Sequence, residues 1–161
     1  MVPFTSFILF FLGCLIGLPL VEGTSVRSSC PPGWFFYRSH CYGYIRQKKP
    51  WAEAEFECHS YGHGAHLTSI LDDAEASIVA SSISAYQTKI GVWVGLHDPE
   101  KNQRWKWNDG SLYNYKAWKK RESINSEKGG HCVVLTSGSG FKKWKGSACD
   151  AGKHFLCKYK P

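Results

Sequence analysis

Three groups of side chains in this 161-residue chain have the types and spacing to do chemistry. The first is the tripeptide Trp107-Asn108-Asp109, which puts a carboxamide beside a carboxylate. Calcium in proteins takes oxygen ligands of this kind, but it needs several of them converging on one ion. Asn-Asp-Gly is also a favourable turn sequence. The tripeptide alone therefore leaves a metal site and an ordinary turn both open.

The second group consists of His59, His63 and His66. Neutral imidazole is a common metal ligand. Gly62 and Gly64, however, interrupt any helix that would align the three rings on one face. We therefore expect these histidines to have a structural or surface role and not to bind a metal.

The third group is the polar run that follows His97, with donors and acceptors able to hydrogen-bond sugar hydroxyls. Its members are Asp98, Pro99, Glu100, Lys101, Asn102 and Gln103. Pro99 stiffens the run and lowers the entropy lost on binding. The alternative is an ordinary solvated turn.

The motifs of the common catalytic sites are missing. There is no G-x-S-x-G nucleophile motif, and no pair of acids lies in a credible cleft motif. The Gly-Ser run at 137–140 opens no predicted helix and lacks the Lys-Ser/Thr of a phosphate-binding loop. We expect no enzymatic activity.

The chain begins with an apolar run that predicts secretion. Residues 7–20 are apolar, the only charged side chain before Gly23 is Glu22, and the run is too short for a comfortable membrane span. We interpret residues 1–23 as a signal peptide, with an uncleaved anchor as the alternative, and residues 24–161 as one secreted domain. No later segment is apolar enough for membrane insertion.

Cysteine usage agrees with an oxidising compartment. Cys14 is lost with the signal peptide, and the remaining six are Cys30, Cys41, Cys58, Cys132, Cys149 and Cys157. An even number in a secreted chain predicts three disulfides, although the count alone leaves every pairing open. A zinc site is disfavoured because no two of the six lie two to four residues apart.

Charge is uneven along the chain, whose formal net charge is +7. Residues 24–100 carry six basic and eight acidic side chains, whereas residues 101–161 carry fourteen and four. A basic half can attract acidic polysaccharide or anionic lipid, and secretion makes nucleic acid an unlikely partner. The alternative is a solubilising surface. The candidate side chains are Lys116, Lys119, Lys120, Arg121, Lys128, Lys142, Lys143 and Lys145.

Periodicity predicts an α+β domain. Residues 30–45 form a predicted hairpin around Arg38-Ser39-His40. A short helix follows Pro50 and ends near Gly62, with Trp51, Ala54 and Cys58 inward. A second helix has Ser69 and Asp72 as a capping box, and its apolar stripe is Ala76, Val79, Ile83 and Tyr86. The short runs 92–96, 104–107, 131–135, 141–144 and 154–159 predict strands of an antiparallel sheet.

Several motifs resemble the C-type lectin-like domain over residues 30–159. They are a cysteine at the first helix, "WVGL" at 93–96, "WKWNDGS" at 105–111, and the series Cys132, Trp144, Cys149 and Cys157. The segments "SCPPGWFFYRSHCYGY", "SYGHGAHLTSI", "WVGLHDP" and "HFLCKYKP" further resemble the regenerating (Reg) islet-derived proteins, most closely the type 4 member.

The resemblance implies two helices packed on antiparallel sheets, in the long form of the domain. The pairings that it implies are Cys30–Cys41, Cys58–Cys157 and Cys132–Cys149, of which the second would tie the first helix to the last strand. The resemblance also implies a small secreted lectin of gut epithelium or pancreas.

The same resemblance predicts that calcium is not required. In calcium-dependent members the ligands come from a Glu-Pro-Asn or Gln-Pro-Asp tripeptide before the cysteine equivalent to Cys132, and from Asn-Asp directly after the strand tryptophan. Here no proline lies between residues 100 and 160, and the second place holds Trp144-Lys145-Gly146. A lysine ammonium there would repel Ca²⁺. The Asn108-Asp109 pair falls in the family's ordinary strand and turn, so we expect no metal and no cofactor.

Together these features predict a secreted, calcium-independent lectin for mannose-rich glycans such as mannan, in gastrointestinal or other epithelial secretions. The resemblance places sugar contacts in Asp98–Gln103 and in Gly138, Ser139 and Gly140, although the second loop has short side chains. One alternative is a secreted signalling ligand, for growth or regeneration, that binds a cell-surface receptor. The other is a binder of heparin-like glycans through the basic half.

Overall fold

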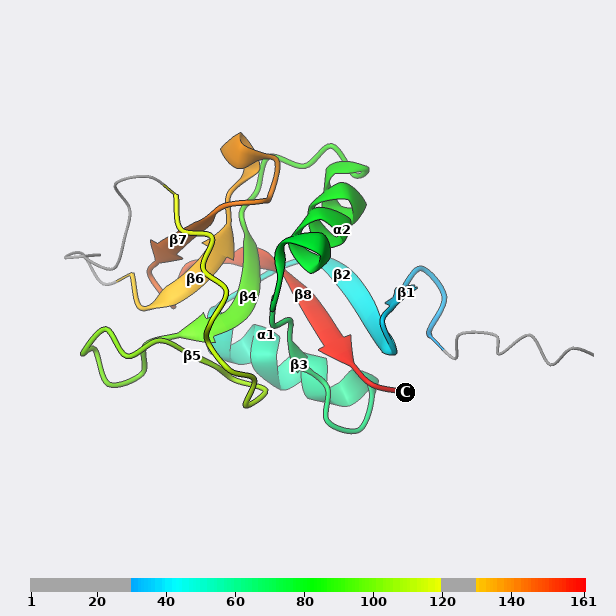
Figure 1. The fold of residues 1–161 in the computed structure, drawn as a ribbon, viewed down its shortest axis with the longest axis horizontal. Helices are drawn as coiled ribbons and strands as arrows, with labels where there is room; N and C mark the ends of the chain where they lie inside the picture. The colour runs from blue at the N-terminus through cyan, green and yellow to red at the C-terminus, as the bar shows by residue number, and fades with distance from the viewer. Residues whose placement is uncertain (1–29, 120–129) are drawn as a thin grey trace, which may run out of the picture.

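The computed structural model describes residues 30–119 and 130–161. The described strands form one sheet in the order β1-β2-β8-β4-β6-β7, with β3 beside β8 and β5 beside β4 (Figure 1). The strands are β1 (Phe35–Tyr37), β2 (His40–Lys49), β3 (His66–Leu67), β4 (Val92–His97), β5 (Lys106–Trp107), β6 (Cys132–Leu135), β7 (Trp144–Ser147) and β8 (Lys153–Tyr159). The helices are α1 (Trp51–Cys58) and α2 (Asp73–Ser84), with 3₁₀ turns η1 (His59–Tyr61) and η2 (Ser137–Ser139).

The central strands bury both of their faces, because successive side chains of a strand point to opposite sides. In β8, Leu156 packs in one core, whereas Phe155 and Cys157 pack in another. In β4, Val94 joins the first core and Trp93 the second. Two apolar cores therefore lie on the two sides of one sheet.

Each helix covers one of these faces (Figure 1). Helix α1 contributes Ala54 and Cys58 to the core of Trp93, as the sequence predicts. Helix α2 contributes Val79 and Ile83 to the opposite core. Tyr86, expected in the α2 stripe, lies beyond the end of the helix and is 43% exposed, so it is not part of this core.

The start of α2 differs by one turn from the predicted cap. The N-cap is Asp72, whose side chain accepts a hydrogen bond from the backbone N–H of Glu75. Ser69, the predicted cap, is fully buried and donates instead to Asp109. The N-cap is therefore three residues later than expected, and the Glu75 side chain accepts the backbone N–H of Leu71 and not that of the N-cap residue, so the reciprocal bond of a capping box is replaced by a bond one residue earlier.

The sheet is mixed and not purely antiparallel. Strand β4 runs parallel to β8, with Val92 opposite His154 and Trp93 opposite Phe155. Every other pairing between the described strands is antiparallel. Parallel neighbours need a long crossover, and here the chain from β4 to β8 passes through β5, β6 and β7 before it returns.

Two predicted strands are shorter than their apolar runs. Of the 104–107 run, only Lys106 and Trp107 form a strand, β5. Of the 141–144 run, only Trp144 is in a strand, as the first residue of β7. Phe141 has a φ of 66°, which is incompatible with extended strand. The first hairpin turns over Arg38 and Ser39, both with positive φ, so His40 already belongs to β2.

All three disulfides have the expected pairing: Cys30–Cys41, Cys58–Cys157 and Cys132–Cys149. The second joins the end of α1 to β8, and both of its cysteines are fully buried. Within the described residues, the helices are too short or too polar to cross a bilayer. The predicted signal peptide, residues 1–23, lies outside the part of the chain that the structure describes.

Candidate carbohydrate-binding site

The polar run 98–103 forms a compact loop directly after β4, and Asp98 holds it together. The Asp98 carboxylate accepts the backbone N–H of Asn102 through Oδ1 at 3.2 Å and that of Gln103 through Oδ2 at 2.9 Å. The backbone N–H of Asp98 donates to the carbonyl of His131 at 2.8 Å. Asp98 is 1% exposed, so its carboxylate faces the loop interior, and contacts with a sugar have to come from its neighbours.

Asp98 is ionised in this setting. Burial by itself raises the pKa of the carboxyl, but hydrogen bonds from the backbone of Gln103 and Asn102 and from the side chain of His131 outweigh that effect. The net result is a pKa below the ordinary value. The loop is thus fixed by a buried carboxylate whose charge is compensated by directed donors.

The other side chains of the run face solvent. Pro99, Glu100, Lys101, Asn102 and Gln103 are all exposed. The Asn102 carboxamide bridges the loop: its Nδ2 donates to Glu100 at 3.1 Å, and its Oδ1 accepts the backbone N–H of Arg104 at 3.1 Å. Lys101 and Gln103 have φ values of 54° and 65°. Such left-handed geometry at non-glycine residues costs about 1 kcal/mol or more each and clusters at functional sites.

A cleft of about 490 Å³ opens beside this loop, lined by His97, Asp98, Pro99, Lys101, His131, Cys132, Ala148, Cys149 and Asp150. The His97 ring stacks on Trp51 with 4.4 Å between ring centroids. Burial, followed by the nearby charge of Lys106, lowers the pKa of His97, which favours its neutral form. The cleft therefore offers neutral and charged hydrogen-bonding groups on a rigid wall.

Five residues of this site were not anticipated: Arg104 in the loop, and His97, Ala148, His131 and Asp150 in the cleft wall. A signal for the last two was present in the sequence. Each is the direct neighbour of a cysteine in the pair Cys132–Cys149, so that disulfide brings them to the same place.

The second predicted loop lies at the other end of the sheet. His97 pairs with Cys132 and Val92 with Leu135, so the loop after β4 and the loop after β6 leave from opposite ends of β6. Figure 1 shows η2 (orange) at the top and the loop between β4 and β5 (yellow-green) at the lower left. The structure therefore does not combine them into one site.

The hydroxyl of the second loop is also used internally. Ser139 Oγ lies 2.6 Å from Thr136 Oγ1 and accepts the backbone N–H of Lys143 at 2.9 Å. Gly138 and Gly140 contribute backbone only, and Gly140 has a φ of 64°. This loop has few groups left with which to address a sugar.

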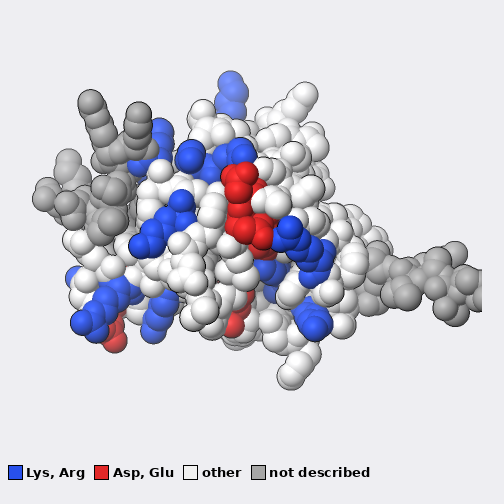
Figure 2. All heavy atoms as spheres, in the orientation of Figure 1, with Lys and Arg blue, Asp and Glu red and all other residues white. Residues whose placement is uncertain are grey.

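The predicted basic cluster is only partly gathered. The backbone N–H of Lys119 donates to the carbonyl of Trp144, which brings residues 116–119 alongside β7 and Lys145. Lys142 instead turns to α2, where it contacts Ser77 and Asp73. Lys143 is exposed, and Lys120, Arg121 and Lys128 lie outside the described residues. On the face of the molecule drawn in Figure 2, basic side chains lie in separate groups with acidic ones among them.

The Trp107-Asn108-Asp109 string is a structural turn. Trp107 is 3% exposed, and the backbone N–H of Asn108 donates to Gly95. Both Asp109 oxygens accept hydrogen bonds, one from the Ser69 hydroxyl and one from the backbone N–H of Ser111. Asp109 therefore holds the turn together and links it to Ser69.

Comparison with known proteins agrees with this architecture. The model of the family described as "Lectin C-type domain" matches residues 47–159. Regenerating islet-derived protein 4 of Homo sapiens is 46% identical over 154 residues, which covers 96% of both chains. This chain belongs to the Reg family of C-type lectin-like proteins. Lithostathine-1 of Mus musculus is also similar to this Reg protein, at 44% identity over 92% of this chain and 94% of its own.

Solved structures of Reg proteins share the fold. Human lithostathine superposes with a TM-score of 0.78 at 42% identity, covering 82% of this Reg protein and 100% of that chain. A point mutant of the human Regenerating Gene Type IV protein gives a TM-score of 0.66 at 49% identity, covering 83% and 99%.

Proposed function

We propose that this Reg protein is a secreted lectin that binds mannose-rich glycans without calcium, through the exposed loop 99–104 beside the cleft. The observation that supports the proposal most is the loop itself. A buried carboxylate holds its backbone in an unfavourable left-handed geometry, and its polar side chains project into solvent. A loop ordered before binding loses little entropy when a sugar docks.

The loop has groups suited to vicinal hydroxyls. Glu100 accepts hydrogen bonds and Lys101 donates them, while Asn102 already has both ends of its carboxamide oriented by neighbours. A few such bonds support weak binding, since a Kd of ~1 mM corresponds to about −4 kcal/mol. Useful avidity then requires a polymer with many sugars, such as mannan.

Two features favour binding without a metal. Asp109 is engaged in its own turn, and Lys145 stands exposed on β7, directly after Trp144, where calcium-dependent members have a ligand. An ammonium group a few ångströms from a divalent cation is repelled, and it supplies no lone pair.

The test is retention on mannan-agarose with and without EDTA. We expect equal retention under both conditions, and a loss of at least fivefold for the double variant Glu100→Ala/Asn102→Ala. Asp98 is left intact, because its removal would disturb the loop itself. The matched control is Gln47→Ala/Glu53→Ala, which removes the same functional groups from exposed positions on β2 and α1. Retention abolished by EDTA, or unchanged in the loop variant, would refute the proposal.

A heparin-like glycan is the second candidate, favoured by the placement of residues 116–119 against β7. Repeating the retention assay at higher salt distinguishes binding through neutral sugar hydroxyls from binding through charge. Attraction between exposed charges is screened beyond ~8 Å at physiological salt, so a charge-driven interaction fades as salt rises. Retention through neutral sugar hydroxyls should persist at about 0.5 M NaCl, where the screening length is shorter still.

A further inference from the structure

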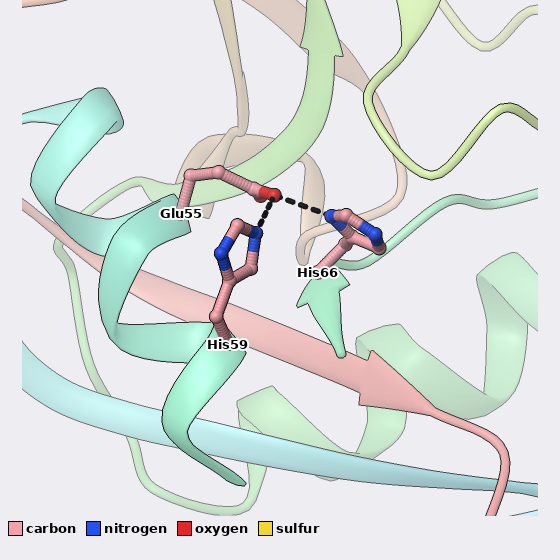
Figure 3. Close-up of side chains that lie close together, drawn as sticks. All are labelled: Glu55, His59 and His66. Carbon is pink, nitrogen blue, oxygen red and sulfur yellow. Dashed lines mark hydrogen bonds and ion pairs between the residues drawn. The ribbon is translucent and has the colours of Figure 1, made fainter. Parts of the chain in front are cut away.

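We propose that Glu55, His59 and His66 form a zinc-binding site on the far end of α1 (Figure 3). One ligand atom from each residue lies within 4.8 Å of the other two. The Glu55 carboxylate oxygen Oε1 stands between the two imidazoles, 2.8 Å from His59 Nε2 and 2.5 Å from His66 Nδ1. Figure 3 shows both rings directed toward this oxygen.

Helix geometry explains the first pair. Glu55 and His59 are four residues apart, and such residues lie on the same face of a helix, one turn above the other. Glu55 is in α1, and His59 follows its last residue with αR backbone angles, so the helical spacing extends to it. The same spacing brings two ligands to one ion in helical zinc motifs.

The chain reversal after α1 supplies the third residue. The turn through Gly62 and Gly64, where Gly64 has a φ of 69°, returns the chain to β3 and places His66 beside the helix. The glycines that argued against a helical array of histidines are therefore what allows two of them to meet.

Glu55 is held in position from its other side. Its Oε2 accepts the backbone N–H of Leu67 at 2.8 Å, which leaves Oε1 directed at the histidines. Its side chain is 8% exposed, compared with 50% for His59 and 29% for His66. A fixed, nearly buried carboxylate beside two reachable imidazoles resembles the way that outer contacts orient metal ligands.

The donor set points to zinc and not to calcium. Two imidazole nitrogens and one carboxylate oxygen are a known three-ligand set for Zn²⁺, whereas calcium takes oxygen ligands almost exclusively. A pocket of about 260 Å³ adjoins the cluster, lined by His59, His63, His66, Gly62, Gly64 and Ala65. It leaves room for water as the fourth ligand.

The movement needed to bind an ion is small. With zinc–ligand bonds of about 2.0–2.1 Å in tetrahedral geometry, neighbouring ligand atoms lie about 3.3 Å apart. Compared with the present distances of 2.8 Å for His59 and 2.5 Å for His66, the two contacts to Oε1 have to lengthen by about 0.5 Å and about 0.8 Å. His59 is half exposed and can move that far by rotation of its side chain. Each imidazole nitrogen that now donates to the carboxylate has to lose that proton on binding, so that the ring is neutral with its remaining proton on the other nitrogen and presents a lone pair to the ion.

Calorimetric titration of ZnCl₂ into the chelator-washed, oxidised protein tests the site. All six cysteines of the described residues are in disulfides, so their thiols do not compete for the metal. We expect one equivalent to bind, and His59→Gln and His66→Gln each to weaken binding at least tenfold. Zinc should also raise the melting temperature of the wild type but not of these variants.

His40→Gln is the matched control, because His40 lies on β2, outside the cluster, where its Nδ1 lies 2.9 Å from the backbone carbonyl oxygen of Arg38. It should bind zinc as the wild type does. Equal zinc affinity in wild type, His59→Gln and His66→Gln would overturn the site, as would the absence of saturable binding. Glu55→Gln keeps an acceptor for Leu67 and should also bind at least tenfold more weakly, with its melting temperature in the absence of metal reporting the fold.

The zinc site is separate from the proposed sugar site. Trp51, at the start of α1, stacks on His97 in the cleft wall, whereas His59 follows the last residue of the same helix. About 12 Å of helix lies between them, at 1.5 Å per residue. Mannan retention should therefore be unchanged in His59→Gln, and failure of either proposal leaves the other standing.

Discussion

At the scale of single residues, Asp98 decides whether the candidate loop exists as a fixed surface. The amino-acid composition of residues 98–103 shows that this run is polar, but it does not show which side chain turns inward. Asp98 does so because the two backbone donors of Asn102 and Gln103, together with His131, compensate its burial. The remaining polar side chains of the run are exposed to solvent. Sequence reasoning could predict the loop but not this division of roles.

Asp98→Asn should destabilise the protein by about 1–3 kcal/mol at neutral pH, because the partly buried backbone N–H groups of Asn102 and Gln103 lose a charged acceptor. The pKa of Asp98 is lowered in the folded state, so its stabilising effect is complete above the unfolded value of about 3.9. The effect disappears only as the pH falls through the lower folded pKa. Urea unfolding at several pH values should show a constant difference from wild type above pH ~5 that shrinks below pH ~4.

Glu100→Gln is the control for that experiment, since Glu100 is an exposed carboxyl in the same loop. Its unfolding free energy should stay within about 0.5 kcal/mol of the wild type, as for most surface substitutions. A difference between Asp98→Asn and wild type that grows as the solution becomes more acidic would contradict the assignment.

The zinc-site residues show the same limit of sequence reasoning. The i, i+4 spacing of Glu55 and His59 is visible in the sequence, but the return of His66 depends on the turn at Gly62 and Gly64 and on β3 pairing with β8. Glycine indicates that a helix ends. It does not indicate where the chain goes next.

At the scale of elements, a buried ion pair ties α2 to β8. Lys158 Nζ lies 2.6 Å from Glu75 Oε1, and both residues are less than a tenth exposed. Tyr42 donates to the same oxygen at 2.6 Å. Burial, followed by the hydrogen bond to Glu75, raises the pKa of Tyr42 and keeps its hydroxyl protonated as a donor. The pair thus fixes the first helical turn of α2 against the sheet.

Lys158→Met should lower the free energy of unfolding by about 3–5 kcal/mol, because it leaves the Glu75 carboxylate buried without its counter-ion. Urea denaturation followed by tryptophan fluorescence measures the change. Lys142→Met is the matched control: Lys142 pairs with Asp73 on the same helix at 3.7 Å, but that pair is exposed and should contribute less than about 1 kcal/mol. Similar losses in the two variants would show that the buried pair has no special role.

Most elements could be predicted because their periodicities are strong. The stripe Ala54 and Cys58 in α1, and the alternation of β4 and β8 between two cores, follow directly from side-chain geometry. Which strands pair with one another could not be predicted in the same way. The parallel pairing of β4 with β8 has no local signature, and the early end of α2 follows from backbone turns that apolar periodicity does not report.

At the scale of the whole molecule, the three surfaces considered for sugar or zinc binding lie apart from one another. The loop 99–104 and its cleft lie at one end of β4, the Ser137–Gly140 turn lies at the other, and the histidine cluster lies at the far end of α1. The resemblance to a family predicts which segments carry function. It could not predict their separation here, because the distance between two loops depends on strand register, which is set by the folded sheet.

Of the disulfides Cys58–Cys157 and Cys30–Cys41, the first should contribute more to the free energy of unfolding. Cys58–Cys157 spans 99 positions of sequence, whereas Cys30–Cys41 spans 11. In the chain-entropy model, closing a loop of ~100 residues stabilises the folded state by about 4.7 kcal/mol, and a loop of roughly a dozen by about 3 kcal/mol. Cys58 and Cys157 are also fully buried between α1 and β8, so their replacement removes packing as well as the link.

Cys58→Ala/Cys157→Ala should therefore lose more stability than Cys30→Ala/Cys41→Ala, by about 2 kcal/mol or more in urea unfolding. Its m-value should rise further too, because an unfolded chain freed from the longer loop exposes more surface. Equal losses in the two variants, or a larger loss on removing Cys30–Cys41, would mean that the hairpin and not the link from helix to strand limits the stability of this fold.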